Sequence, residues 1–526
     1  MSLGDRLKFP YFWVLFPGVF LCLSILVSYF GLFGSWIVSV FGVPYYYNWD
    51  PDGFYLGAGL TFFDERYVWV GHPGIPLMFL IHSISKVFYW LGLLFGASVP
   101  IETFTAKNIF WIILVTKSAI TIVHILSFCI LYRISLIFLT KTASKIAILS
   151  YATSVIILYY MNKISPEPLL VLFVLLSIFW IWKYVENHHK YKGYIWLALS
   201  AFAGIAAVMT KIMIATPLVA FLPAYILLHQ GISLKNKMSG TCLFLCFGAM
   251  FFILLGWKVD WYYFFQFWSQ YAPSNPDSTG GVYPLFSFIQ AISHIITNFL
   301  FIMADGLFSF FSISGLTSQK GQFNAAELPF MALSVVGFIQ YWKDNPPKRR
   351  QMTWLLIFAL ITAPCVLYKG AYHYLVIHLA FAAIFFSYFI CESISKILKG
   401  TALSKNKFAT AVIATLMIHS LSIAIFVETK WSDIRNYMNN WQPYYIGLNT
   451  INHEERIGIS NTRDKSEIPG RLISYYVPPS SSFNKRFRDY FVYLDGDTSQ
   501  DKLKEKNITV VISSGAEWTN IIRNSN

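Results

Sequence analysis

The sequence predicts a polytopic α-helical membrane protein with a small α/β domain at its C-terminal end. Three observations support this fold class. Hydrophobic residues make up 56% of the 526 residues, and charged residues only 13%, against about 25% in a typical soluble protein. Apolar runs of about 20 residues, the length that a helix needs to cross a bilayer, recur along the chain. The last hundred or so residues, by contrast, are polar enough to fold in water.

The apolar runs predict about eleven membrane spans. Several of them are rich in Phe, Ile and Leu all round, so their hydrophobic period does not show which helix face points inward. We expect residues 1–427 to form the membrane domain. The predicted spans cover approximately residues 11–40, 107–132, 146–162, 166–182, 194–211, 212–229, 240–257, 328–342, 352–368, 374–395 and 408–427.

The net charge of +14 predicts the orientation of these spans. If the N-terminus is cytoplasmic, the segments on that side hold eighteen Lys and Arg residues against four acids, which accounts for the whole net charge. Cytoplasmic loops of membrane proteins carry such an excess of basic residues. This distribution favours an orientation signal over a nucleic-acid-binding surface, so we expect no nucleic-acid partner. We predict an integral protein of a bacterial inner membrane, with its C-terminal domain periplasmic or extracellular.

Two further apolar stretches, about 75–97 and 291–312, would reverse the orientation of basic segments if they crossed the membrane. We therefore expect both to lie on the outer face as interfacial helices, a position that suits His82 and Lys86. The six cysteines all fall inside predicted spans, which favours apolar packing over a disulfide framework. The outer regions are then the loops at about 43–106 and 258–327 and the tail 428–526.

The tail, residues 428–526, predicts a small α/β domain. Short strands are predicted at 456–460 and 490–494, a helix at 499–506 and a buried strand at 508–513. The tail carries no metal-ligand cluster and no nucleophile motif. Support of the membrane domain or binding of an acceptor is the role that we expect for it.

The first outer loop carries an acidic motif, Asp50-Pro51-Asp52-Gly53-Phe54-Tyr55. Acids close to hydrocarbon are candidates for function because charge is costly there. Asp50 or Asp52 could act as a general base towards a hydroxyl, or the two could bind a divalent cation. Asp-Pro-Asp-Gly is also favourable turn chemistry, so a solvated turn is the structural alternative.

His72 follows in the same loop, within His72-Pro73-Gly74-Ile75-Pro76. It could hold a phosphate or a sugar hydroxyl. A lone histidine is more often structural, and Pro and Gly could simply end the loop and start a helix.

Lys211 lies at the outer end of the predicted span 194–211, and Glu167 lies in a very short outer turn. Lys211 could face a lipid phosphate as a point charge, or it could only snorkel to the interface. Glu167 could be a helix N-terminal carboxylate favoured by the helix dipole, or a supporting partner in the site.

Lys369, His373 and Tyr374 belong to the same outer face, where the span 374–395 begins. Polar side chains that converge on one membrane face are more typical of a site than of scattered solvation. No Walker loop, dinucleotide fingerprint, GxSxG elbow or HExxH motif occurs. The converging residues are Asp50, Asp52, His72, Glu167, Lys211, Lys369 and His373.

In this order of motifs the chain resembles the GT-C superfamily of membrane glycosyltransferases. It is most similar to the branch of protein O-mannosyltransferases and the aminoarabinose transferase of lipid A. In that branch an outer loop after a long first span carries an acidic motif, a Tyr and a His-Pro-Pro-type motif, and the run from Asp50 to Tyr55 followed by His72-Pro73-Gly74 is similar. Thr210-Lys211 is similar to a segment that ends a later span, and His373-Tyr374-Leu375 to the start of a late one.

The resemblance implies a sugar donor linked to a polyprenyl phosphate, and an acceptor hydroxyl on a lipid, glycan or protein at the outer face. Asp50 or Asp52 would be the base of a single inverting displacement, and Lys211, with His373, would offset the charge of the departing phosphate. Tyr55, His72, Glu167, Lys369 and Tyr374 are expected to bind substrates, with membrane lipids as further partners.

Three departures from the motifs of the branch bear on these roles. The acidic motif is Asp50-Pro51-Asp52 where the branch usually has Asp-Glu or a variant, so either carboxylate could be the base. Gly74 stands where the branch has a second proline, which leaves the role of His72 open. A second Asp-x-Asp, which metal-dependent oligosaccharyltransferases carry, is not visible, so we expect no required cofactor and do not favour a cation at Asp50 and Asp52. Two alternative functions remain: a polymerase or ligase of lipid-linked glycans with a pyrophosphate donor, and a lipid or glycan transporter.

Overall fold

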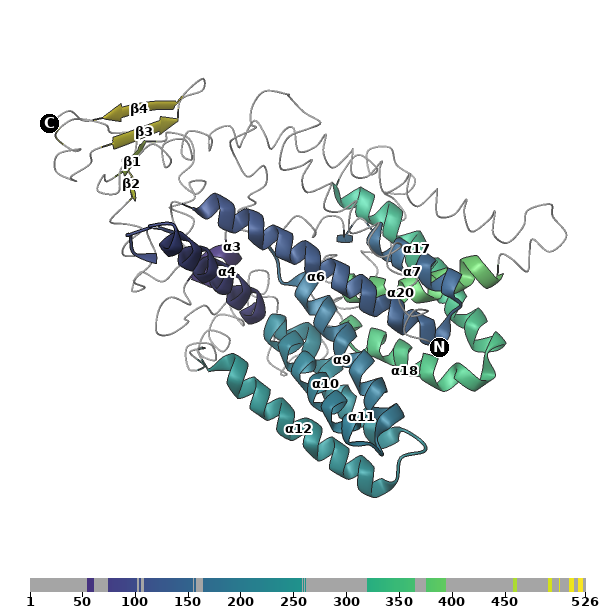
Figure 1. Cartoon of the computed structure of the whole chain (residues 1–526). Helices are drawn as coiled ribbons and strands as arrows, with labels where there is room; N and C mark the ends of the chain where they lie inside the picture. The colour runs from purple at the N-terminus through teal and green to yellow at the C-terminus, as the bar shows by residue number, and fades with distance from the viewer. Residues whose placement is uncertain are drawn as a thin grey trace, which may run out of the picture.

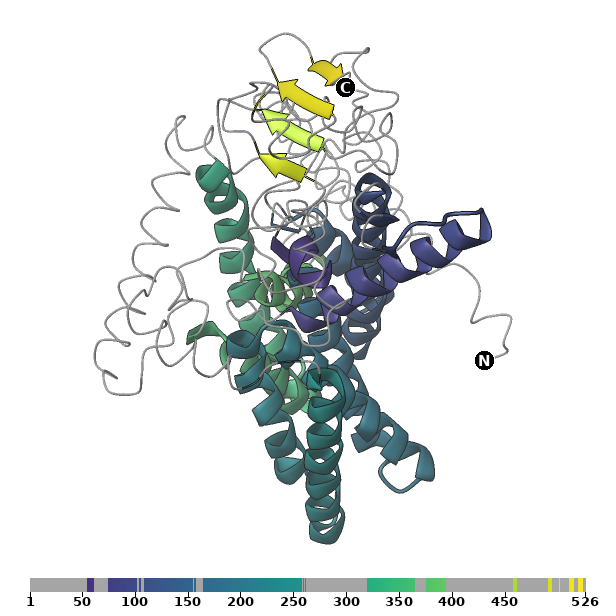
Figure 2. The same ribbon diagram turned by 90° about the vertical axis from the view of Figure 1, so that its left-hand side faces the viewer.

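The chain forms a helical bundle with a small β-sheet beyond one end (Figures 1 and 2). The structure is a computed structural model. The described part contains five helices that are long and apolar enough to cross a membrane, and two shorter apolar ones. The protein is accordingly an integral membrane protein. The structure describes residues 54–60, 74–101, 104–105, 108–154, 156–157, 164–257, 259, 261, 319–364, 375–393, 457–460, 491–493, 501, 510–514 and 519–523.

The first part of the bundle consists of helices that run back and forth along its length. Polar side chains begin two of them: Thr140 Oγ1 accepts a hydrogen bond from Ala143 N at 3.3 Å, and Ser233 Oγ accepts one from Asn236 N at 3.4 Å. Such N-caps satisfy amides that a helix start leaves open. The helices are α6 (Ile109–Phe138), α7 (Lys141–Ala152), α9 (Glu167–Asn187), α10 (Tyr191–Thr210), α11 (Ile212–Leu228) and α12 (Leu234–Gly256).

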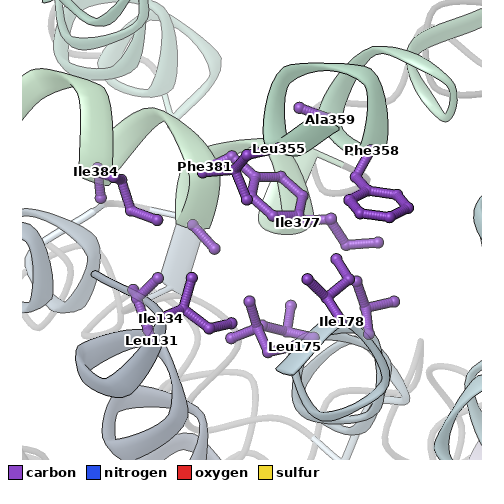
Figure 3. Close-up of a cluster of buried hydrophobic side chains, with 14 of the residues drawn as sticks. Leu131, Ile134, Leu175, Ile178, Leu355, Phe358, Ala359, Ile377, Phe381 and Ile384 are labelled. Carbon is purple, nitrogen blue, oxygen red and sulfur yellow. The ribbon is translucent and has the colours of Figure 1, made fainter. Parts of the chain in front are cut away.

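A second group of helices completes the core. Every residue of α20 is buried, as expected of a helix that is apolar all round and packed on all sides. In Figure 3, Ile377, Phe381 and Ile384 of α20 meet side chains of α6, α9 and α18. The elements are α17 (Gln319–Asp344), the 3₁₀ turn η4 (Pro346–Lys348), α18 (Arg349–Leu360), α20 (Val376–Tyr388) and the π-helical turn η6 (Phe389–Ser393).

Each predicted span that falls on described residues overlaps a helix, which confirms the helical membrane fold. The lengths differ: α6 has 30 residues and extends past the predicted end at 132, whereas α7 ends at Ala152. The predicted spans 11–40 and 408–427 and the predicted interfacial stretch 291–312 lie outside the described residues. The number of eleven spans therefore stays a prediction.

The short helix α3 (Phe54–Leu60) packs against α4 (Ile75–Leu94), the stretch that we expect to lie in the interface. In Figure 2, α4 runs obliquely across the direction of α12. The buried residues of α4 all lie between Ile75 and Ser85 and include His82, whereas Lys86 and most of the last turns are exposed. His82 thus packs inside the protein instead of facing the interface. With 20 residues and a largely apolar sequence, α4 is also long enough to cross a bilayer, so its interfacial position stays a prediction.

The tail contains a four-stranded sheet of order β2-β1-β3-β4. β1 (Ile457–Ser460) pairs in parallel with β2 (Phe491–Tyr493) and β3 (Val510–Ser514), and β4 (Thr519–Arg523) pairs antiparallel with β3. The three predicted strands match β1, β2 and β3, whereas β4 was not predicted. The predicted helix 499–506 lies outside the described residues except for Asp501, so the α/β character of the domain stays a prediction.

The sheet lies beyond the end of the bundle at which α6 begins and α12 ends (Figures 1 and 2). Glu167 begins α9, which runs in the same direction as α6, and α10 ends at Thr210 beside Lys211. The tail sheet and these two candidate residues therefore lie at one end of the bundle, which we call the outer end. The opposite end, where α6 and α11 finish, is called the inner end.

Candidate active site

Three of the candidate site residues, Tyr55, Glu167 and Lys211, lie in the described part of the chain. The burial and the contacts of these three side chains show which chemistry the outer end of the bundle can support. The other candidates lie outside the described residues, and their roles stay predictions: Asp50, Asp52, His72, Lys369, His373 and Tyr374.

Glu167 is the first residue of α9 and is only 3% exposed. Pro166 precedes it as the N-cap and Pro168 follows it, and proline suits the first turn because the amides there have no partner within the helix. A carboxylate in the first turn is also favoured by the positive end of the helix dipole. The local sequence therefore starts a helix and places a negative charge at its outer tip.

Lys211 separates α10 from α11, at φ −150° and ψ 89°. Its amide donates to Ala207 O at 3.0 Å, and its carbonyl accepts from Ala215 N at 3.0 Å. The last bond of one helix and the first bond of the next are thus both kept while the chain changes direction. The side chain is buried and belongs to the same outer end as Glu167.

The two side chains form a buried ion pair, with Lys211 Nζ 3.2 Å from Glu167 Oε1. Only 10% of the lysine side chain and 4% of the glutamate side chain are exposed. Water screens such a pair poorly, and removing either partner would leave a buried charge without its counter-charge. The pair therefore fixes an ammonium group at the outer end of the bundle.

A pair of serines sets the register that brings Glu167 and Lys211 together. Ser177 Oγ donates to Ser200 O at 3.1 Å, and Ser200 Oγ donates to Ser177 O at 2.8 Å. Glu167 lies ten residues before Ser177 and Lys211 eleven residues after Ser200. At 1.5 Å per residue these are rises of about 15 and about 17 Å along antiparallel helices. Glu167 and Lys211 therefore lie at about the same level along the axes of α9 and α10.

Tyr55 lies in α3 and is 3% exposed. Its ring lies against the backbone of Gly74, where a Cβ atom would come within 2.6 Å of Tyr55 Cε1. Any side chain at 74, including a proline ring, would therefore collide with the tyrosine. This contact joins the acidic motif to the His72-Pro73-Gly74 motif and gives a physical reason for the departure from Pro-Pro.

Several buried polar residues near the core were not predicted as site residues. Lys117, Thr121 and His124 of α6 are at most 2% exposed. His378 Nε2 lies 3.1 Å from Thr362 Oγ1 in the buried contact between α20 and the end of α18. The sequence signal for this part of α6 is Lys117, a lysine within an apolar run, because charges in such runs are functional candidates by default.

Within the described ranges, no group of three or more His, Cys, Asp and Glu side chains could hold a metal ion. Asp50 and Asp52, where a divalent cation was considered, lie outside those ranges.

No protein-family model matches the chain, and no curated protein sequence matches it. Its structure is similar to that of ArnT from Cupriavidus metallidurans bound to undecaprenyl phosphate, with 11% identity, a TM-score of 0.55 and 98% of each chain covered. It also matches the archaeal oligosaccharyltransferase AglB from Archaeoglobus fulgidus at 12% identity over 97% of this chain and 70% of that one. The TM-score of 0.46 for AglB does not establish a shared fold by itself. The likeness to ArnT, over nearly the whole length of both chains, confirms for the fold alone the resemblance to the aminoarabinose transferase of lipid A.

Proposed function

We propose that the protein is an inverting membrane glycosyltransferase that moves a sugar from a polyprenyl-phosphate carrier to an acceptor hydroxyl at the outer end of the bundle. The observation that carries this proposal is the buried Glu167–Lys211 pair at that end. A protein of the same fold, ArnT from Cupriavidus metallidurans, was solved with undecaprenyl phosphate bound. A fixed ammonium group beside the membrane surface suits the phosphate of such a lipid.

The reaction is a single displacement. Asp50 or Asp52 takes the proton of the acceptor hydroxyl as its oxygen attacks the anomeric carbon. The bond between that carbon and the phosphate oxygen breaks, and polyprenyl phosphate leaves with one additional negative charge. Lys211, with His373, stabilises this developing charge. No covalent intermediate on the protein is needed.

Glu167 has a positioning role in this scheme. Its carboxylate, 3.2 Å from Lys211 Nζ, holds the lysine side chain in one place before the donor arrives. Preorganised charges stabilise a transition state well because they need no reorganisation during the reaction. Tyr55 supports the loop of the predicted base through its contact with Gly74. His72, Lys369 and Tyr374 complete the substrate-binding set.

The test is transfer from a synthetic polyprenyl-phosphate sugar by the purified full chain and by its Asp50→Asn and Asp52→Asn variants. We expect one of the two to lose about 10²–10⁴-fold in rate, the usual contribution of a positioned general base. Glu186→Gln is the matched control, because Glu186 is an exposed carboxylate at the inner end. Full activity in both aspartate variants would show that the base is another residue.

Two additions to the same assay separate the remaining alternatives. A lipid pyrophosphate that competes better than the monophosphate would favour a glycan polymerase or ligase. Movement of labelled lipid across proteoliposomes without a covalent product would favour a transporter.

Two further experiments test the cation and the orientation. Activity that survives a chelator would support the proposal that no divalent cation is required. Labelling of single cysteines in whole cells would test the proposed cytoplasmic N-terminus and outer C-terminal domain.

A further inference from the structure

The inner ends of α11, α12 and α18 bring two basic side chains and one histidine together. His229 directly follows α11, Lys237 is the fourth residue of α12, and Arg350 is the second residue of α18. All three are partly exposed, so a ligand can reach them from the inner end. The proposed transfer reaction uses none of them.

The contact between α11 and α18 places Arg350 beside His229. The rings of Tyr225 and Trp354 lie 5.0 Å apart between centroids. His229 follows Tyr225 by four residues in a helix that ends at the inner end. Arg350 precedes Trp354 by four residues in a helix that begins there. Both side chains therefore lie one turn closer to the inner end, about 6 Å at 1.5 Å per residue. Arg350 also donates to Leu228 O, the carbonyl directly before His229.

The turn from α11 to α12 brings Lys237 to the same place. Gly231 has a φ of 93°, a left-handed conformation that favours glycine and lets the chain reverse within a few residues. Ser233 then begins α12, and its carbonyl accepts from Lys237 N at 2.9 Å. Burial, followed by the charges of Arg350 and Lys237, lowers the pKa of His229. Both bases are therefore close to the imidazole.

Positive charge dominates this end of the bundle. The segments that we predict to be cytoplasmic hold eighteen Lys and Arg residues against four acids. Two of these acids have partners: Glu186 pairs with Lys183 at 2.6 Å, and Asp344 accepts a hydrogen bond from a tyrosine of α20 at 2.8 Å. Bases exceed acids here wherever the other two, Asp5 and Glu392, lie. The ligand that suits this surface is therefore an anion.

His229 offers a hydrogen-bond partner to an anion. Within the part of the chain that the structure describes, its Nδ1 is buried and makes no hydrogen bond. Most buried polar atoms in proteins have a partner, so one without a partner requires an explanation. An imidazole nitrogen that carries a proton donates to an anion oxygen. An oxygen bound between the two bases would supply the missing partner.

Exposed apolar side chains lie beside the three polar ones. Leu228, Leu234 and Met238 are each more than half exposed. They lie at the end of α11 and in the first turns of α12, next to His229 and Lys237. In a membrane protein such side chains contact acyl chains, while basic groups at the same level reach the lipid headgroups. An anionic group attached to an acyl chain fits both parts of this surface.

We propose that Arg350, Lys237 and His229 bind the headgroup phosphate of an anionic phospholipid at the inner end of the bundle. The inference does not rest on the proposed function, because the Glu167–Lys211 pair lies at the opposite end. The bound lipid links the ends of α11, α12 and α18. A ligand that binds only the folded protein stabilises it.

The experiment compares binding of phosphatidylglycerol with binding of the zwitterionic phosphatidylcholine by the full chain in a neutral detergent, measured by native mass spectrometry. Lys237→Gln and Arg350→Gln should each weaken binding of phosphatidylglycerol about fivefold, the usual contribution of one base beside anionic lipid. Binding of phosphatidylcholine should stay unchanged. Lys141→Gln is the matched control, since Lys141 is an exposed lysine at the inner end, in the first turn of α7.

Three results would overturn the proposal. The first is wild-type binding of phosphatidylglycerol by both Lys237→Gln and Arg350→Gln. The second is an equal loss in Lys141→Gln, because the lipid would then respond to the overall charge of the inner end. The third is competition by glycerophosphoglycerol, the same headgroup without acyl chains, as strong as that of the lipid itself, which would identify a soluble phosphate compound as the ligand. Sugar transfer enters none of these measurements, so the proposed function stands or fails separately.

A second measurement uses the wild-type protein and covers the case in which Arg350→Gln does not fold. The groups that face His229 are Tyr225 of α11, Arg350, Lys237 and His188 after α9. Burial and the basic groups favour the neutral ring, whereas a bound phosphodiester favours the protonated one. The preference for phosphatidylglycerol should therefore increase as the pH falls from about 7.5 to about 5.5. The increase should be smaller in His229→Gln, and an equal increase would remove His229 from the proposed site.

Discussion

The two ends of the helix bundle use basic side chains in different ways. At the inner end, Lys348 Nζ donates to Ile137 O at 2.6 Å, Arg349 Nε donates to Trp342 O at 2.6 Å, and Arg350 donates to Leu228 O. These carbonyls lie in the last turns of α6, α17 and α11. At the outer end, by contrast, Lys211 is buried against Glu167, and Lys117 is fully buried in α6.

The difference shows that burial, and not residue type, separates the two roles. Carbonyls at a helix end have no partner within the helix and carry the negative end of the dipole, so exposed Lys and Arg suit them. These contacts also agree with the excess of bases in the segments that we predict to be cytoplasmic. A buried lysine loses its hydration, and the protein has to supply a specific anion in return. We therefore propose a binding role for Lys211, whereas the inner Lys and Arg residues cap helix ends.

The largest effect is expected from removing one member of the buried pair. Lys211→Met or Glu167→Gln should lower stability by about 3–5 kcal/mol, because one buried charge remains without its partner. Transfer by Lys211→Met should fall by about 10²–10³-fold, as when a donor to a developing anion is lost. Thermal unfolding and the transfer assay measure the two effects separately.

The double variant Lys211→Met/Glu167→Gln sharpens this comparison. It should regain most of the stability but not the transfer activity. The pair Lys183–Glu186 at the inner end, at 2.6 Å but with side chains 34% and 53% exposed, provides the matched cycle. Its coupling energy should be only about 0.2–0.5 kcal/mol. Equal coupling energies at both ends would contradict the role that we give to burial.

The second-largest effect is expected at Gly74. Gly74→Ala places a Cβ atom against the Tyr55 ring, and overpacking of this kind lowers stability by about 1–3 kcal/mol. Transfer should fall too, because Tyr55 belongs to the acidic motif that contains the proposed base. Gly248→Ala is the control, since the nearest atom to a Cβ there would be Ile205 Cδ1 at 3.8 Å, an ordinary contact. A Gly74→Ala protein with wild-type stability would mean that the ring moves without penalty.

A smaller effect is expected from Lys348→Met at the inner end. Loss of one exposed cation at a helix C-terminus should lower stability by about 0.3–1 kcal/mol and leave transfer unchanged. The difference from wild type should shrink at high salt, because exposed charges are screened. Denaturation at low and high ionic strength measures it. A large loss of transfer in Lys348→Met would break the contrast between the two ends.

The smallest effect is expected from His229, directly after α11. Burial, followed by the charges of Arg350, Lys237 and His188, lowers the pKa of His229 below its ordinary 6.5. The folded protein thus binds this proton less tightly than the unfolded chain does. Its contribution to stability is present above pH 6.5 and is lost as the pH falls through the folded-state pKa. The melting temperature of wild type should therefore fall relative to that of His229→Gln as the pH is lowered below 6.5, and an unchanged difference would contradict the lowered pKa.

The membrane fold could be predicted from the sequence because length and hydropathy determine a span almost alone. β3, Val510–Ser514, could also be predicted, because its consecutive β-branched residues favour a strand. β4, Thr519–Arg523, was missed because its sequence, Thr-Asn-Ile-Ile-Arg, has only two adjacent β-branched residues between polar ones, and the strand depends on pairing with β3. The buried half of α4 also could not be predicted, since it depends on which helices it meets.

The candidate site was predicted in part. Glu167 and Lys211 were each recognised from their places at the ends of spans, but not as a pair. Their pairing depends on the register between α9 and α10, which the contacts of Ser177 and Ser200 reveal only in three dimensions. The burial of Lys117 likewise depends on how α6 packs against its neighbours.

The register between α9 and α10 also limits how the sequence can change. One residue inserted between Glu167 and Ser177 would turn the glutamate by about 100° and raise it by about 1.5 Å, away from Lys211. Four inserted residues would nearly restore the direction but move the carboxylate by about 6 Å. The same holds between Ser200 and Lys211. In proteins that keep this ion pair, these two stretches should keep their lengths, whereas the exposed turn at 188–190 is free to vary.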